Sequence, residues 1–272
     1  QGHIGRSALE GVELMSVGAN YLRGHVERDV CINYAVLDAG GTAANNFPAQ
    51  ASVLYLLRAN TQEKAYAAYE RLLKVAEGAA LMSGTSVTHE KSWGTSELIQ
   101  VRSFEQLLHE KLVAVGPTPY TEADLRAAQE IRKTFPDNAE DSTLSTLRML
   151  YGDTAEEIIP AIRGKAINDI VYPYVPIPMA KYGSTDVCDV SWFTPTTQVT
   201  TACYAKDTPG HSWFEVAQGK NELCHSGMLT AAKVLALAGT ELFLRPDRLA
   251  QIRAEWKQRL VGKTYRRFEK EN

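Results

Sequence analysis

Five side chains that can bind metals or move protons lie within one stretch of the sequence, residues 183–228. They are two aspartates, one cysteine and two histidines: Asp186, Cys188, Asp189, His211 and His225. Carboxylate, thiolate and imidazole groups are the side chains that hold divalent metals in proteins. No short-range ligand motif joins them, so a surface helix with a capping loop remains the alternative interpretation.

His225 has the most informative position of the five. Ser226 could cap a helix whose apolar residues recur at steps of four and three: Met228, Ala232, Leu235, Gly239 and Leu242. An imidazole at a helix N-terminus lies at the positive end of the dipole, which disfavours the imidazolium and leaves a nitrogen lone pair free. The pattern therefore favours His225 as a metal ligand at the start of this helix.

Other chemistry is less well supported by the spacing. Ser184, His211 and Asp186 could be combined as a nucleophile, a base and an acid, but no G-x-S-x-G elbow accompanies them. Arg58 ends an otherwise apolar strand, where it is either a charge at the rim or a fork directed at a carboxylate. Gly40-Gly41 leads into a strand and not into a helix, which predicts a tight turn with close backbone approach instead of a phosphate loop.

Composition limits the class of protein. The 272 residues are 44% hydrophobic and 22% charged with a net charge of −3, which is typical of a soluble globular protein without a nucleic-acid surface. We expect no membrane segment, because no apolar run approaches about 20 residues. The four cysteines form no C-x-x-C pair, which favours free thiols in the cytoplasm. Small molecules or proteins are the expected partners.

Hydrophobic periodicity predicts the elements of the first part of the chain. They are a helix, two strands, a long helix and a third strand, at residues 6–23, 30–37, 53–58, 65–82 and 85–91. This order is that of a ferredoxin-like β-α-β-β-α-β unit lacking its first strand, so the chain is expected to begin inside a domain. Residues 1–3 look like the remnant of a purification tag.

Helices predominate in the second part of the chain. Four are predicted, at residues 104–113, 122–134, 226–244 and 246–260. Thr121 and Asp141 are possible helix caps. An extended segment at 167–175 and a buried strand at 198–204 complete the pattern, which favours an α/β layer structure.

Several stretches, in order along almost the whole chain, resemble one family. They are GRSALEGVELM at 5–15, GGTAANNFP at 40–48 followed by VLYLLR, GSTDVCDVSW at 183–192, TPGHSW at 208–213 and HSGMLTAAK at 225–233. These stretches resemble the di-metal amidohydrolases and carboxypeptidases of the aminoacylase/carboxypeptidase-G type. The implied activity is hydrolysis of an amide that joins an acyl or aroyl group to a small amino acid such as glutamate.

The resemblance implies an α/β fold with an α+β lid. A catalytic α/β domain like that of zinc peptidases would bind two divalent metal ions, zinc or manganese, and a ferredoxin-like lid domain would mediate dimerisation. Residues 1–93 would be the lid, lacking its first strand, and residues 94–272 the C-terminal half of the catalytic domain. The partner through the lid would be a second copy or a related subunit.

Six site residues follow from the same resemblance. The substrate-binding residues would be Asn45 and Arg58, on the substrate carboxylate, with Ser184, Asp186 and His211, while His225 would be the last metal ligand.

The chain also departs from the family pattern. The family's H-x-D segment and Glu-Glu pair, which carries the general base, are absent and are expected upstream of residue 1. We therefore expect the 272 residues alone to be inactive and to hold no metal. Cys188 stands where the family has Gly. A non-catalytic dimerisation or binding module is the alternative, and the sequence leaves open the acyl group, the native metal and the identity of the partner subunit.

Overall fold

The computed structural model describes residues 2–177 and 184–267, and these form two compact units. Unit 1 comprises Gln1–Glu97, Ser184–Asp189 and Tyr265–Asn272, and unit 2 comprises Leu98–Gly183 and Val190–Thr264. The described residues are rich in helix and have one small sheet of two strands. This mixed composition is compatible with the predicted α/β class.

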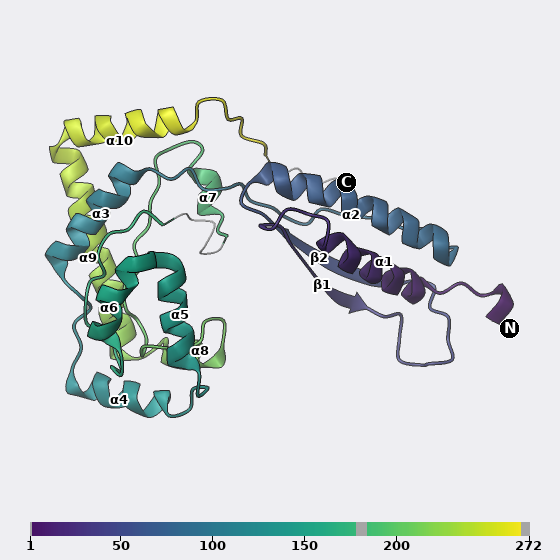
Figure 1. Ribbon diagram of the computed structural model, residues 1–272, viewed down its shortest axis with the longest axis horizontal. Helices are drawn as coiled ribbons and strands as arrows, with labels where there is room; N and C mark the ends of the chain where they lie inside the picture. Colours follow the sequence, from purple (N-terminus) through teal and green to yellow (C-terminus); the bar gives the residue numbers. More distant parts are fainter. Residues whose placement is uncertain (1, 178–183, 268–272) are drawn as a thin grey trace. The chain divides into compact units, whose positions relative to one another are not determined.

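Unit 1 contains two helices and a β-hairpin, as the periodicity predicts. Its elements are η1 (Gly2–Ile4), α1 (Ala8–Arg23), β1 (Cys31–Asp38), β2 (Ser52–Arg58) and α2 (Gln62–Ser83). The helices lie side by side (Figure 1). Ser7 caps α1 and Thr61 caps α2, each side chain accepting a hydrogen bond from a first-turn N–H.

One face of the hairpin packs against both helices. The strands are antiparallel, with Cys31 opposite Arg58 and Tyr34 opposite Tyr55. Ile32 of β1 is only 2% exposed and lies in a core with Ala19 and Leu22 of α1 and Leu72 of α2. A Cβ added to Gly18 would lie 2.6 Å from Val75 Cγ1, so a small residue is required where the two helices meet.

The predicted third strand at 85–91 is wrong. These residues have no regular secondary structure. The Lys91 ammonium instead lies over the rings of Tyr66 and Tyr69 of α2, 5.5 and 5.1 Å from their centroids. A β-rich composition forms a strand only where another strand offers a hydrogen-bonding edge, and here side-chain contacts hold the segment against a helix.

Unit 2 is built mainly from helices. They are α3 (Arg102–Val115), α4 (Glu122–Arg132), α5 (Ala139–Tyr151), η2 (Gly152–Thr154), α6 (Ala155–Ile162), α8 (Trp213–Gln218), α9 (Glu222–Leu244) and α10 (Pro246–Arg259). A short helix, α7 (Val187–Val190), crosses the boundary between the units. Thr121 caps α4 in a complete capping box, which confirms that prediction. Asp141 is not a cap, because α5 begins after Asn138.

The predicted strand at 198–204 is also wrong. Residues 197–203 have no regular structure, and the nearest pairing is a single parallel bridge between Gln100 and Thr196. The Thr201 hydroxyl donates to the carbonyl of Gly227 in α9 at 2.8 Å. This segment therefore packs on a helix. Residues 167–175 are non-helical, which agrees with the predicted extended segment.

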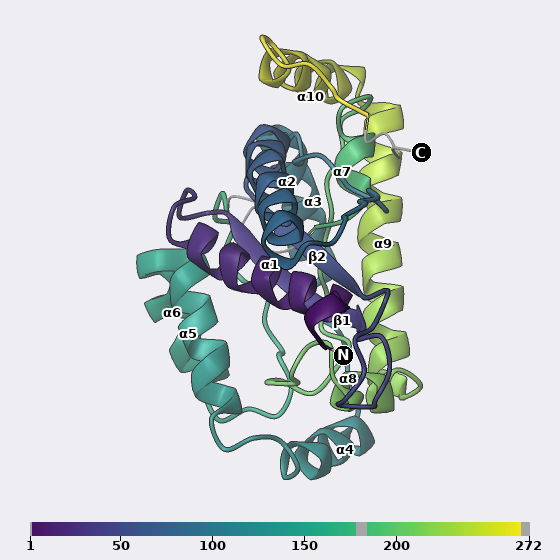
Figure 2. The same ribbon diagram turned by 90° about the vertical axis from the view of Figure 1, so that its right-hand side faces the viewer.

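Unit 2 has several small apolar clusters. α5 and α6 pair through Leu144, Leu147, Ile158 and Ile162 (Figure 2). α3 and α9 pack side by side through Leu108, Val234 and Ala238. These contacts position the loops between the helices, which carry most of the polar residues considered below.

Helix α3 is capped by a distant residue. Val101, at its N-cap position, provides no side-chain acceptor. The Glu255 carboxylate of α10 accepts hydrogen bonds at 2.9 Å from the backbone N–H groups of Arg102 and Ser103, and one at 2.6 Å from the Ser103 hydroxyl. An anion at a helix N-terminus is favoured by the dipole, so this contact ties α10 to α3.

Glu255→Ala is expected to destabilise unit 2 by about 1–2 kcal/mol, because orphan N–H groups at a helix start lose their acceptor. Urea unfolding measures this, and Gln106→Ala, at an exposed position of α3, is the control.

Burial opposes ionisation of Glu255, but the bonds from Ser103 and Arg102 outweigh it and hold the pKa below the usual 4.5. The folded state therefore binds fewer protons than the unfolded state. The stabilisation is complete above the unfolded pKa and is lost as the pH falls through the folded value. An equal Glu255→Ala effect at neutral pH and in strong acid would contradict this account.

The helix α9 is long, apolar and largely exposed. By length and composition it is the one helix among the described residues that could cross a membrane. It also carries Glu222, Lys233 and Glu241, and the expectation of no membrane segment stays a prediction. Its exposed apolar side chains are Met228, Leu229, Leu235, Leu237, Phe243 and Leu244.

Candidate functional site

His225 lies inside α9 and not before it. The helix begins four residues earlier than predicted, because Asn221 and not Ser226 is the N-cap, its side-chain oxygen accepting the Cys224 N–H at 2.7 Å. The N–H of His225 bonds to the Asn221 carbonyl at 3.3 Å. The imidazole is therefore still in the first turn of the helix, where the dipole acts.

The surroundings of His225 supply few further ligands. Its side chain is 50% exposed, and Nδ1 lies 3.8 Å from Oε1 of Glu222. Within residues 2–177 and 184–267, no group of three or more His, Cys, Asp or Glu side chains could hold a metal ion. A structural or catalytic zinc takes at least three protein ligands, so the described residues do not complete such a site.

His211 occupies a strained turn before α8. Its φ of 55° is in the left-handed region, which costs free energy in a residue with a Cβ. The N–H of His211 donates to Glu215 Oε2 at 3.0 Å, and the Ser212 hydroxyl donates to the carbonyl of Pro209. The turn presents the exposed imidazole to solvent, where it could contact a ligand.

Asn45 and Arg58 are both exposed in unit 1. Asn45 lies in the turn between the strands, and Arg58 ends β2. At the start of the same loop, Gly40 has a φ of 79° and accepts no Cβ, which would lie 2.1 Å from Pro48 Cβ. The predicted tight turn with close backbone approach is confirmed.

Ser184 and Asp186 precede α7, while Gly183 lies outside the described residues. The Thr185 hydroxyl donates to Asp186 Oδ1 at 3.2 Å. Asp189 is half-buried and accepts the Ser96 N–H at 2.9 Å. Burial raises the pKa of the Cys188 thiol, so this cysteine is a poor thiolate ligand in the free protein.

The six predicted site residues divide between the two units. Asn45, Arg58, Ser184 and Asp186 belong to unit 1, whereas His211 and His225 belong to unit 2.

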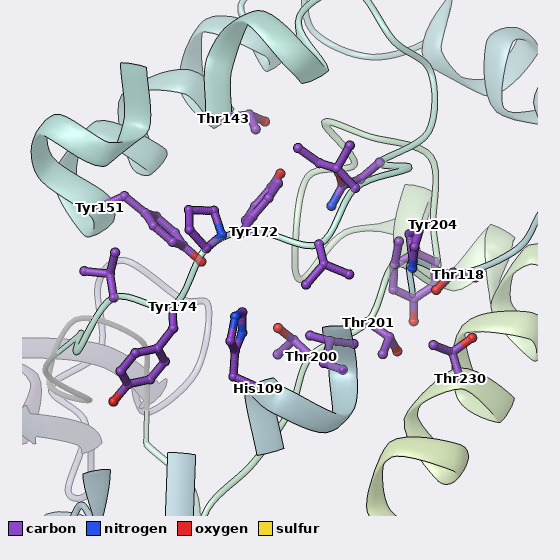
Figure 3. A pocket seen from close by; sticks show the side chains of 18 of the residues that line it. His109, Thr118, Thr143, Tyr151, Tyr172, Tyr174, Thr200, Thr201, Tyr204 and Thr230 are labelled. Atoms are coloured by element: carbon purple, nitrogen blue, oxygen red, sulfur yellow. The ribbon is translucent and has the colours of Figure 1, made fainter. Parts of the chain in front are cut away.

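Unit 2 contains a cavity of about 500 Å³ that the sequence did not reveal (Figure 3). Its walls come from α3, the segment 168–177 and the segment 200–208, and Thr230 of α9 contributes a further hydroxyl. The polar side chains labelled in the view are His109, Thr118, Thr143, Tyr151, Tyr172, Tyr174, Thr200, Thr201, Tyr204 and Thr230. This volume suits a small molecule with a ring and hydrogen-bonding groups.

Three ring side chains of the cavity are held neutral. Burial, and then the charge of Asp207, raise the pKa of Tyr172 to about 12. Burial and a hydrogen bond donated to Glu105 at 2.9 Å raise the pKa of Tyr174 to about 12. Burial lowers the pKa of His109, whose ring centroid is 5.8 Å from that of Tyr174. At neutral pH these three groups can exchange hydrogen bonds with a ligand but carry no charge.

Two polar atoms in the cavity wall lack hydrogen-bond partners among the described residues. They are Oγ1 of Thr118, a residue exposed to only 3%, and Oδ1 of Asn168. A buried polar atom without a partner costs about 1–3 kcal/mol, so a ligand or water that bonds to it would be favoured.

A buried ionic cluster lies at the edge of the cavity. Lys206 Nζ bonds to Asp207 Oδ2 at 2.8 Å and to Glu140 Oε1 at 2.8 Å, and Arg132 also pairs with Asp207. The side chains of Lys206 and Asp207 are 3% and 1% exposed. The only sequence signal was the Lys-Asp pair within YAKDTPG, which resembles many exposed turns.

The comparisons with known proteins support the resemblance seen in the motifs. No family model matches the chain. It is 34% identical over 256 residues, 94% of its length, to a subunit of the p-aminobenzoyl-glutamate hydrolase of Escherichia coli (strain K12). The chain is a relative of this hydrolase subunit. This confirms the likeness that GGTAANNFP, TPGHSW and HSGMLTAAK indicated, both to the amidohydrolase family and to this subunit within it. The chain spans 53% of the length of that subunit.

Proposed function

We propose that this chain forms part of a metal-dependent amidohydrolase that cleaves an acyl or aroyl amide of a small amino acid, such as p-aminobenzoyl-glutamate. The observation that carries the proposal is the identity of 34% over 256 residues to a hydrolase named for that substrate. An identity of this level along nearly the whole chain is strong support for a shared fold.

The chain's own contribution would be to bind the substrate. Asn45 and Arg58 would hold the free carboxylate of the amino acid, because a guanidinium and an amide together offer several N–H donors to two oxygens. Ser184, Asp186 and His211 would complete the substrate-binding residues. We assign no general base to these 272 residues.

Metal binding fits the chain only in part. His225 would be one ligand of a pair of zinc or manganese ions in the complete hydrolase, but the described residues do not bring three ligands together. We therefore expect this chain alone to hold no metal and to be inactive.

A chimaera tests the proposal. The chain would replace the matching part of the E. coli subunit, and the chimaera would be produced together with the other components of that hydrolase. Release of p-aminobenzoate from p-aminobenzoyl-glutamate by the chimaera, and none by the 272 residues alone, is expected. A folded chimaera without activity, beside an active parent, would refute the proposal.

Arg58→Ala in the active chimaera should raise KM for a substrate with a free carboxylate by roughly ten- to a hundredfold. Loss of a charge-assisted hydrogen bond to a carboxylate costs about 1.5–3 kcal/mol, and about 1.4 kcal/mol is tenfold. Arg58→Lys keeps the positive charge, so its KM should rise far less than that of Arg58→Ala. Arg28→Ala, which removes an exposed guanidinium from the same unit, is the control. An unchanged KM in Arg58→Ala would exclude this residue from the site.

A non-catalytic binding module is the second candidate. It is favoured by the cavity of unit 2, where the Thr118 and Asn168 oxygens could bond to a ligand. Metal analysis of the chimaera separates the two functions, because about two bound metal ions per chain would support the enzyme and none would support the module.

We further propose that residues 1–93 belong to a ferredoxin-like lid and that residues 94–272 belong to the catalytic domain. The lid would pair with a second copy of the chain or with a different subunit. The relative is named as one subunit of a hydrolase, and this name supports such pairing. A monomeric mass in light scattering at high protein concentration would exclude pairing with a second copy of the chain.

A cytoplasmic location is also proposed, and cell fractionation tests it.

A further inference from the structure

The wall of the cavity in unit 2 is rich in aromatic rings. The ring centroids of Tyr151 and Tyr172 lie 5.7 Å apart, edge to face. Those of His109 and Tyr174 lie 5.8 Å apart. These four rings occupy one side of the view in Figure 3, and Thr118 lies on the other. Rings in such arrangements offer both faces and edges to a further aromatic ring.

The wall offers no counter-ion to a charged ligand. Among the described residues that line the cavity there is no lysine or arginine, and Asp207 is the one acidic residue. Its carboxylate is bonded to Lys206 and Arg132, and Lys206 is also bonded to Glu140. Two cations and two carboxylates thus balance one another. A charged ligand would lose its hydration in the cavity without gaining a partner of opposite charge.

Two side chains of the wall have hydrogen-bonding capacity to spare. Thr118 is only 3% exposed, and its Oγ1 bonds to no described group. Oδ1 of Asn168 is buried and equally unpaired. A hydroxyl can donate or accept, whereas an amide oxygen only accepts, so a ligand that satisfies Asn168 must carry an N–H or O–H donor.

We propose that the cavity of unit 2 binds an uncharged aromatic compound that carries a hydrogen-bond donor, such as an aromatic carboxamide. The ring would pack among the tyrosine and histidine rings. The carboxamide N–H would donate to Asn168 Oδ1, and its carbonyl would accept the Thr118 hydroxyl. The inference goes beyond the proposed hydrolysis, because p-aminobenzoyl-glutamate bears carboxylates and is not a ligand of this class.

Benzamide, benzoate and benzamidine test the proposal, because they have nearly the same shape but are neutral, negative and positive. Each is titrated into the 272-residue chain and followed by ligand-observed NMR. We expect saturable binding of benzamide with a Kd of about 0.1–10 mM, which suits a ligand of its size. Benzoate and benzamidine should bind at least about tenfold more weakly, because neither charge finds a counter-ion.

Thr118→Val keeps the shape of the side chain but removes its hydroxyl. The Kd for benzamide should rise roughly three- to tenfold, the usual effect of losing one neutral hydrogen bond. The urea midpoint of the free protein should stay unchanged or rise, since the hydroxyl bonds to no described group there. Asn168→Leu should weaken binding similarly. Thr146→Val, the same change at an exposed position of α5, is the control and should leave the Kd unaltered.

Three results would overturn the inference. Benzamide could fail to bind saturably, benzoate or benzamidine could bind as tightly as benzamide, or Thr118→Val and Asn168→Leu could both leave the Kd unchanged. The titrations involve no turnover, so a negative result would leave the proposed hydrolysis standing. An inactive chimaera would equally leave this binding site standing.

Discussion

His225→Ala should remove about one metal equivalent and most of the activity from the chimaeric hydrolase while its fold stays intact. The variant loses an imidazole ligand, and even partners that only orient metal ligands contribute about 10–100-fold to affinity or activity. We therefore expect kcat/KM to fall by more than about a hundredfold. The fold should survive because Asn221, and not His225, caps α9, and because the imidazole is half-exposed.

Metal content by mass spectrometry, activity and far-UV circular dichroism measure these effects. Lys233→Ala, at an exposed position further along α9, is the matched control and should keep the metal. In the 272 residues alone, His225→Ala should change nothing. Stoichiometric zinc binding by the unaltered chain would contradict this, and would mean that Asp186, Cys188, Asp189 or His211 helps to complete a site.

Lys206→Ala is expected to cost about 3–5 kcal/mol of folding free energy, the usual effect of removing one member of a buried ion pair. Asp207 is 1% exposed, so its carboxylate would keep Arg132 but lose the ammonium that bonds to both of its oxygens. With a total stability of about 5–15 kcal/mol in an ordinary domain, unit 2 could lose much of its folded population. Urea unfolding followed by circular dichroism measures the loss.

Lys165→Ala provides the matched control. Lys165 also pairs with an aspartate, Asp169, at 2.7 Å, but its side chain is 44% exposed, and surface pairs contribute only about 0–1 kcal/mol. The double variant Lys206→Met with Asp207→Asn should recover part of the loss, since it removes both charges and Asn tolerates the φ of 70° at position 207. Equal effects of Lys206→Ala and Lys165→Ala would contradict the assigned burial.

Local features of the site followed from the sequence because they depend on nearby residues. The close turn at Gly40 needed only a glycine between two strands, and the capping box at Thr121 needed only an Asp three residues later. The cap of α9 was misplaced because Asn221 and Ser226 both precede apolar periodic residues, and a side-chain oxygen can cap from either.

The sequence by itself determined the hairpin, the helices α1, α2, α3, α4, α9 and α10, and the relationship to a hydrolase subunit, because hydrophobic period and motif order are properties of the chain. It did not predict the helices α5, α6 and α8. Only the tertiary structure decided that residues 85–91 and 198–204 form no strands, since a strand requires a neighbouring edge that sequence does not locate. The same holds for Glu255 on the start of α3 and for the Lys206–Asp207 cluster. The first joins residues far apart along the chain and the second buries charges that look exposed in sequence, and burial is a consequence of packing alone.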